Sequence, residues 1–212
     1  MALTREKIVD AALVLLEREG LQGISMRKLA QELDAGAATL YWHVGDKERL
    51  LGLMLDRIVG ESKVVDPDPE NWQEQVKQLG RNARELLKSR RGAAQLSMGR
   101  IPTGPNSMPV LERYLAVLHA AALPAQVIAY AADMFSLYVG AFAYEESLEQ
   151  PVDSEQLGAY FSSLPPDEFP ITTSLAAELV AGDADERFEW ALELLVRGLE
   201  SLRREAGDEH GL

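Results

Sequence analysis

SMRKLAQELDAGAATLYWHVGDK, residues 25–47, is the stretch that decides the fold of this chain. Ser25 begins a short helix that ends near Leu33, and a turn follows at 34–36, where Asp and Gly tolerate positive φ. A second short helix covers about 37–43, with small residues first and aromatic residues further along. This layout predicts a helix-turn-helix, whose second helix enters the major groove of DNA with its N-terminal residues on base edges.

Two longer helices flank this motif. Thr4 is a plausible N-cap for the first and Gly20 a plausible stop, and apolar residues recur between them at spacings of three and four. Asp46 is the expected cap of the second helix. The sequence therefore predicts a helix-turn-helix domain over 1–46 and a connecting helix over 47–63.

The remainder of the chain has the pattern of a second, larger helical unit. Prolines and acidic residues at 64–71 break the helical periodicity and mark the clearest internal boundary. Helical spacing then resumes, interrupted by a Gly- and Pro-rich loop at 99–109 and a proline-containing segment at 151–182. Because no segment shows a convincing strand pattern, we expect an all-α fold, with a ligand-binding and dimerisation domain over 64–212.

Charge is distributed unevenly along the chain. The net charge is −13, yet residues 1–50 carry 7 basic against 8 acidic residues, and the remainder carries 14 against 26. Arg27, Lys28 and Lys47 could therefore still meet phosphate. The chain has no cysteine, which excludes disulfides and thiolate chemistry. Its N-terminus lacks the apolar core of a signal peptide, so a cytoplasmic location is expected.

The apolar segment 127–144 allows two interpretations. Its length approaches that of a membrane span, and Asp133 is its only charged residue. A charge near mid-bilayer costs roughly 2.5–3.5 kcal/mol on insertion scales, and no basic flank is present. We therefore expect a soluble central helix that is buried on most sides, and no membrane partner.

The last predicted helix, 183–205, carries apolar residues at alternating spacings of four and three. The members of this seam are Phe188, Leu192, Leu195, Leu199 and Leu202. They could pack on the core of their own chain or form a subunit interface. The interface is favoured, because a helix-turn-helix protein usually binds paired half-sites as a dimer.

Residues 3–55 resemble the DNA-binding domain of the tetracycline repressor (TetR) family. The resemblance is carried by RKLAQ at 27–31 and TLYWHV at 39–44, and it continues in patches such as NWQEQ at 71–75 and IPT at 101–103. It implies a homodimeric transcriptional regulator, most often a repressor, that binds double-stranded operator DNA and is released by a small-molecule inducer.

Carried over by position, the resemblance implies a set of DNA-contacting residues. Arg27 would contact a base, and Lys47 would bind phosphate with help from the positive end of its helix. Alanine can only touch a thymine methyl, so two alanines in the recognition helix imply a different operator from that of the tetracycline repressor. Trp42 is expected in the core. The full set is Ser25, Met26, Arg27, Ala37, Ala38, Thr39, Tyr41, His43 and Lys47.

The same resemblance directs attention to a ligand site. Tetracycline-binding members hold a drug–magnesium chelate through a histidine before the IPT-like loop, but 96–103 contains none. We therefore expect an inducer other than tetracycline–magnesium, with no metal or cofactor. Apolar walls with a few polar groups suit a small-molecule pocket, although these side chains could equally fill the core. The candidates are Arg100, Pro102, Tyr114, Tyr130, Met134, Phe135, Tyr138 and Phe142.

Other functions find less support in the sequence. The chain contains no G-x-S-x-G elbow, no His cluster with metal-ligand spacing and no phosphate-binding Gly loop, so no enzyme is predicted. A protein-interaction module that uses the last helix, and an activator that uses the same helix-turn-helix, remain alternatives. In the favoured mechanism, ligand in the larger domain packs against the connecting helix 47–61 and swings the DNA-binding domain. The two recognition helices, roughly 34–36 Å apart, then no longer fit the operator.

Overall fold

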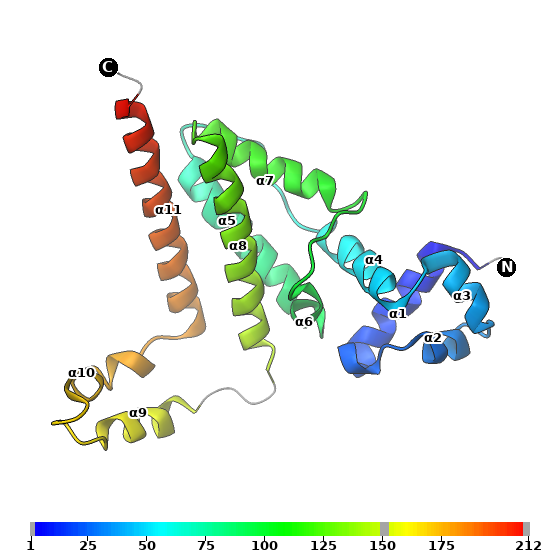
Figure 1. The fold of residues 1–212 in the computed structure, drawn as a ribbon, viewed down its shortest axis with the longest axis horizontal. Coiled ribbons are helices and arrows are strands. Elements are labelled where there is room, and N and C mark those ends of the chain that lie inside the picture. The colour runs from blue at the N-terminus through cyan, green and yellow to red at the C-terminus, as the bar shows by residue number, and fades with distance from the viewer. Residues whose placement is uncertain (1–2, 149–152, 210–212) are drawn as a thin grey trace.

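The computed structural model describes residues 3–148 and 153–209. Over these ranges the chain forms helices joined by loops, without strands (Figure 1). The α-helices are α1 (Arg5–Glu19), α2 (Met26–Glu32), α3 (Ala37–Val44), α4 (Lys47–Val59), α5 (Trp72–Lys88), α6 (Ala93–Ser97), α7 (Met108–Ala120), α8 (Ala125–Glu146), α9 (Ser154–Ser162), α10 (Pro170–Ser174) and α11 (Ala184–Glu209).

Local capping explains where the first helices begin. The Thr4 hydroxyl accepts a hydrogen bond from the Lys7 amide at 3.3 Å, and the Ser25 hydroxyl accepts one from the Lys28 amide at 3.2 Å. The Asp46 carboxylate accepts from the amide of the third helical residue of α4 at 2.8 Å. Each cap satisfies an amide that has no partner inside its helix. These three helix starts follow the sequence prediction.

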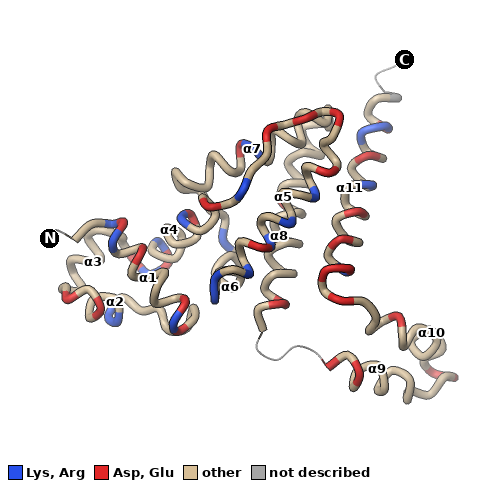
Figure 2. Tube along the Cα trace, turned by 180° about the vertical axis from the view of Figure 1, so that it is seen from behind, with Lys and Arg blue, Asp and Glu red and all other residues tan. Residues whose placement is uncertain are grey.

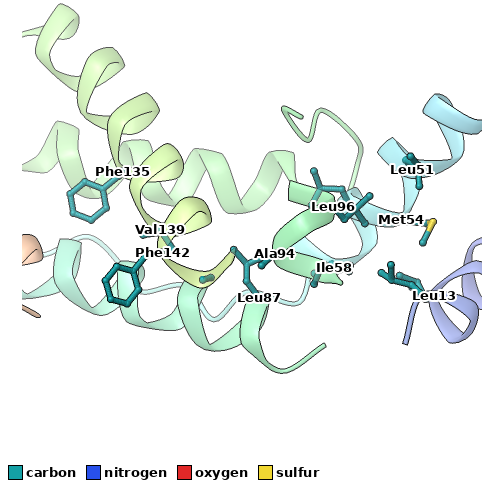
Figure 3. Close-up of a cluster of buried hydrophobic side chains, with 14 of the residues drawn as sticks. Leu13, Leu51, Met54, Ile58, Leu87, Ala94, Leu96, Phe135, Val139 and Phe142 are labelled. Atoms are coloured by element: carbon teal, nitrogen blue, oxygen red, sulfur yellow. The ribbon is translucent and has the colours of Figure 1, made fainter. Parts of the chain in front are cut away.

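The helix α4 joins two packed units. It lies against α1 on the side of the helix-turn-helix domain and against α6 and α5 on the side of the larger unit, which we call the body (residues 64–209). Figure 3 shows one continuous apolar cluster that runs from Leu13 of α1, through Met54 and Ile58 of α4, to Leu96 of α6. Because this core crosses the junction without a break, the two units move together unless the packing around α4 changes.

The body is a bundle in which α5 is the central helix. It packs against α7, α8 and α11, while α6 fills the space between α8 and α4. The pair α9 and α10 lies to one side, beyond the ends of α8 and α11 (Figure 1). These two helices pack mainly on each other and on the short turn that follows them, and they expose Tyr160 and Ile171. They add little to the core of this chain.

Three details of the body differ from the sequence prediction. The five-residue helix α6 was not predicted as a separate element, because five residues are too few for a periodic pattern. About a third of the apolar window of α8 is buried, so the expectation of burial on most sides was wrong. Phe188, Leu192 and Leu199 are at most 3% exposed in the core of their own chain, so the seam of α11 is mainly an intrachain contact.

Acidic side chains dominate the body. Figure 2 shows them along α11, in the linker between α4 and α5 and at the start of α9, whereas basic and acidic residues are interspersed in the helix-turn-helix domain. Many of the body charges form pairs at the contacts between helices, such as Arg81 with Glu189 at 2.6 Å and Lys77 with Glu193 at 3.2 Å. The acidic excess therefore lies away from α2 and α3.

Candidate functional site

The helix α3 is anchored by two side chains and exposes the rest. Leu40 and Val44, one turn apart, are fully buried against α1 and α2. Tyr41 and Trp42 lie between them in sequence and are 52% and 82% exposed. The small residues 37–39 are exposed as well. One face of α3 thus holds the helix in place, and the other presents small, hydroxyl and aromatic groups to solvent.

Trp42 corrects the sequence prediction, which placed it in the core. Successive helical residues turn by about 100°, so a residue two positions after Leu40 points away from the face that Leu40 and Val44 bury. The Trp42 and His43 rings lie nearly perpendicular to each other, at 82°, with centroids 4.6 Å apart. This orientation adds Trp42 to the candidate DNA-facing residues. The spacing of Leu40 and Val44 is the signal that could have found it.

Of the three candidate DNA-contacting residues at the start of α2, two are exposed and one is buried. Ser25 and Arg27 are exposed, whereas Met26 is 7% exposed and belongs to the core. Met26 shares a face with Leu29 and Ala30, three and four residues later, and this face packs on α1 and α3. The Met26 side chain therefore packs in the core of the domain and not on the surface that was expected to face DNA.

The turn between α2 and α3 lines an open hollow beside Arg27 and Gln31. Asp34 adopts the left-handed conformation at φ 47°, whereas Gly36 is extended at φ −72°. Positive φ was expected in this turn, and the structure assigns it to the aspartate alone. The turn carries the chain from α2 into α3 so that the exposed faces of both helices border one concavity.

Ion pairs distinguish the free cations of this domain from the engaged ones. Lys28 pairs with Glu19 of α1, and Arg18 pairs with Glu32 of α2. These contacts lower the pKa of both carboxyl groups, chiefly through the hydrogen bonds from Lys28 and Arg18. Lys28 is thus engaged within the domain rather than presented to phosphate.

The two remaining cations of the predicted site have no such partner. Within the described part of the chain, neither Arg27 nor Lys47 forms an ion pair, and both side chains are exposed. Lys47 is the first residue of α4, where unpaired backbone amides add positive potential. His43 is half-buried, and its carbonyl accepts a hydrogen bond from the Arg5 guanidinium at 3.1 Å. Exposed positive charge therefore lies on either side of α3.

The eight candidate ligand residues fall into three groups. Tyr114 of α7 and Phe135 of α8 face each other in the body, with ring centroids 6.0 Å apart. The Tyr114 hydroxyl is buried without a hydrogen-bond partner in the described structure, and burial raises the pKa of this phenol. A buried hydroxyl without a partner is unfavourable unless a ligand or water completes it. This pair is the strongest part of the predicted pocket.

The second group lies beside α11. Tyr138 stacks on Phe188 with ring centroids 5.7 Å apart. Phe142 packs against Phe188, with centroids 5.1 Å apart, and against the guanidinium of Arg84, whose central carbon is 5.2 Å from the Phe142 ring centre. Phe142 is 8% exposed, so it fills the core beside α11 rather than forming an open pocket wall (Figure 3). Tyr138 and Phe142 therefore follow the alternative prediction, in which the candidate ligand residues fill the core.

The third group lies outside the body core. Tyr130 and Met134 are 70% and 43% exposed on the outer face of α8, away from Phe135. Pro102 and Arg100 lie in the loop after α6, where Arg100 pairs with Glu48 of α4 at 3.0 Å. Within the described ranges, no group of three His, Asp or Glu residues is placed to hold a metal ion. The predicted ligand set is thus not one continuous site in the single chain.

Comparisons with known proteins agree with this architecture. The family described as "Bacterial regulatory proteins, tetR family" matches residues 8–54, and "Tetracyclin repressor-like, C-terminal domain" matches 66–203. The solved structure of apo ActR from Streptomyces coelicolor is 40% identical over 96% of this chain and 99% of its own, with a TM-score of 0.91. ActR has also been solved in complex with actinorhodin and with (S)-DNPA.

Relatives with curated names are also transcriptional regulators. An HTH-type transcriptional regulator of Saccharopolyspora erythraea is 37% identical over 68% of this chain, a match that spans 61% of the relative. Tetracycline repressor protein class C of Escherichia coli is 28% identical over 97% of this chain and 94% of its own. Both relatives are transcriptional regulators by name.

Fold, exposed recognition helix and relatives together define a class. The protein is an all-helical, ligand-responsive DNA-binding transcriptional regulator with a helix-turn-helix at its N-terminus. It belongs to the TetR family, whose N-terminal and C-terminal domains both match this chain.

Proposed function

We propose that the protein is a homodimeric repressor that binds a palindromic operator and is released from it by a small organic molecule. The single observation that carries the proposal is the exposed face of α3 between its two buried anchors, with the unpaired cations Arg27 and Lys47 beside it. A helix of this kind fits the major groove, and flanking cations fix its register through phosphate.

The roles at DNA follow from residue chemistry. Arg27 contacts a base edge from α2, while Thr39, Tyr41 and His43 contact bases or phosphate from α3. Lys47 binds phosphate at the start of α4. Trp42, the most exposed aromatic side chain of α3, joins this surface. Ala37 and Ala38 offer only methyl contacts, so the operator is expected to carry thymine or open space opposite them.

The dimer interface is proposed on the exposed faces of α8 and α11. These helices pack on each other, and each carries a stripe of exposed apolar residues along its outer side. The stripes contain Tyr130, Met134 and Leu137 on α8, and Trp190, Leu194 and Leu202 on α11. Contiguous exposed apolar surface of this kind marks an interaction site. A second copy with the same two helices would cover it.

This assignment also accounts for α8, the single helix within residues 3–148 and 153–209 that could pass for a membrane span. By length and composition α8 is long and apolar enough to cross a bilayer. However, its inner side packs on α5, and its outer side carries the exposed stripe and Asp133. A four-helix contact between two copies would bury the apolar side chains and leave the Asp133 carboxylate in contact with water at the edge of the interface.

The ligand is proposed to enter the body between α5, α7 and α8. The unpartnered Tyr114 hydroxyl supports this position, because a ligand oxygen there would accept its hydrogen bond. ActR, the similar protein solved with actinorhodin, suggests that compound as a first test molecule. Tetracycline–magnesium is not the proposed inducer, because 96–103 offers no histidine and the Ser97 hydroxyl already bonds to the Ala94 carbonyl at 2.8 Å.

The test is selection of bound sequences from a random DNA pool at low ionic strength. We expect a palindrome with half-sites about 10–10.5 base pairs apart, centre to centre. Arg27→Ala combined with Tyr41→Ala should abolish the preference, whereas Arg113→Ala, an exposed arginine on α7, should retain it. The proposal fails if the intact protein selects no palindrome, or if the double variant selects the same one.

A further inference from the structure

The carboxylate of Asp56 is buried at the junction between the two units. Asp56 lies on the last turns of α4 and is 3% exposed. It accepts four close hydrogen bonds from the residues that precede α7. The donors are the Ser107 hydroxyl at 2.7 Å, the Ser107 amide at 2.9 Å, the Asn106 side-chain amide at 2.7 Å and the Asn106 backbone amide at 3.2 Å. All four are neutral and two belong to the backbone, so they fix both the position and the orientation of the loop.

Two glycines allow this approach. A Cβ atom at Gly104 would lie 2.2 Å from the carboxylate carbon of Asp56, and one at Gly60 would lie 2.6 Å from the Cβ of Asn106. Neither separation is possible for real atoms. The loop 104–107 is therefore seated directly on the C-terminal half of α4, in a register that larger side chains would prevent.

The other contacts across the junction are less directional. Apolar packing of Met54 and Ile58 on α6 is strong but roughly non-directional (Figure 3). The Arg100–Glu48 pair has a Glu48 side chain that is 72% exposed, and exposed pairs of this kind constrain geometry weakly. Burial tends to raise the pKa of Asp56, but the hydrogen bonds from Ser107 and Asn106 outweigh it and leave the pKa of this carboxyl below its ordinary value.

From these contacts we propose that Asp56 is a positioning residue that sets the placement of the helix-turn-helix domain on the body, and thereby the half-site spacing that the dimer accepts. Lys47 lies nine residues before Asp56, about 13.5 Å along the helix axis. A tilt of about 10° at Asp56 would move Lys47 by roughly 2 Å, and symmetry doubles the change between two copies. This displacement is comparable with the rise of about 3.4 Å per base pair.

This inference rests on the proposed function, because it requires a dimer on paired half-sites. It is tested with the full-length protein and the selected operator, together with the same half-sites separated by one base pair more or fewer. A duplex with a single half-site reports the DNA contacts alone. The variants are Asp56→Ala and the milder Ser107→Ala, which removes only the hydroxyl. Asp66→Asn is the control, because the Asp66 side chain is 90% exposed and pairs only with Arg113 at the surface.

We expect the intact protein and Asp66→Asn to prefer the native spacing strongly. Asp56→Ala should reduce this preference at least threefold, with Ser107→Ala intermediate, while affinity for the single half-site stays within twofold. Folding is checked by thermal unfolding, and if Asp56→Ala does not fold, Ser107→Ala decides alone. A folded variant that discriminates spacing as the intact protein does overturns the inference and leaves the proposed function standing. Failure of the intact protein to bind any palindrome overturns both.

Discussion

The Arg84 guanidinium and the Glu146 carboxylate form a two-point ion pair between α5 and α8, with N–O distances of 2.6 and 2.7 Å. Their side chains are only 7% and 12% exposed. The central carbon of Arg84 also lies 4.6 Å from the ring centre of Phe188 on α11. Arg84, on α5, therefore holds together α8 and α11, the two helices that carry the proposed dimer face.

Arg84→Ala should destabilise the body strongly. It leaves the Glu146 carboxylate buried with only Lys88 at 3.0 Å, and breaking a buried pair in this way costs roughly 3–5 kcal/mol. Arg113→Ala is the control, because its partner Asp66 is exposed and the loss should stay below about 1 kcal/mol. Chemical denaturation of the purified protein at fixed concentration measures both losses. Equal losses of unfolding free energy in the two variants would contradict the claim that the Arg84–Glu146 pair holds the body together.

The same pair predicts a pH dependence of stability. Burial tends to raise the pKa of Glu146, but hydrogen bonds from Arg84 and Lys88 outweigh it and hold the pKa below its ordinary value of 4.5. A carboxyl whose pKa is lower in the folded state stabilises fully above its unfolded pKa. That stabilisation is lost as the pH falls below about 4.5 and through the folded value. Unfolding free energies measured from pH 7 to 3 should show this loss. In Glu146→Gln, the part of the pH dependence that comes from Glu146 should be absent.

Trp42→Ala and Leu40→Ala should separate DNA binding from folding. Trp42 is 82% exposed, so its removal should change the unfolding free energy by about 0.5 kcal/mol or less while weakening operator binding. Leu40 is fully buried, and its truncation should cost roughly 2–5 kcal/mol. Thermal unfolding and operator titration at one salt concentration measure the two effects. Unchanged operator affinity in Trp42→Ala would remove this residue from the interface.

Leu137→Glu combined with Leu194→Glu should convert the dimer to a monomer. Both leucines are more than half exposed on the outer faces of α8 and α11, so charge there disrupts association rather than the core. Val14→Glu makes the same kind of change at an exposed position on α1 and serves as the control. Sedimentation of the purified proteins gives the mass. A double variant that stays dimeric would place the interface elsewhere.

Tyr114→Phe should leave the fold intact and weaken the response to ligand. The hydroxyl has no partner in the described structure, so removing it costs no internal hydrogen bond and should leave thermal stability equal or higher. Actinorhodin is the test compound, and release from the operator is followed by titration. If intact protein responds and Tyr114→Phe responds equally, the hydroxyl does not contact that ligand.

The sequence by itself determined the helix-turn-helix and the starts of its helices. Thr4, Ser25 and Asp46 cap helices through bonds to amides three residues later, and such bonds depend only on the chain nearby. Leu40 and Val44 are four residues apart and so share one face of α3, which is the face that the structure buries. Local residue chemistry was sufficient for both, because caps and faces are properties of one helix.

Only the tertiary structure decided which surfaces meet. Met26 is buried because α2 packs on α1 and α3, and Phe188 lies in the core of its own chain because α11 packs on α5 and α8. Asp56 and Ser107 are 51 residues apart, and no local sequence pattern predicts the hydrogen bonds between them. Burial and long-range hydrogen bonds depend on several helices at once, and the periodicity of a single segment carries no information about its neighbours.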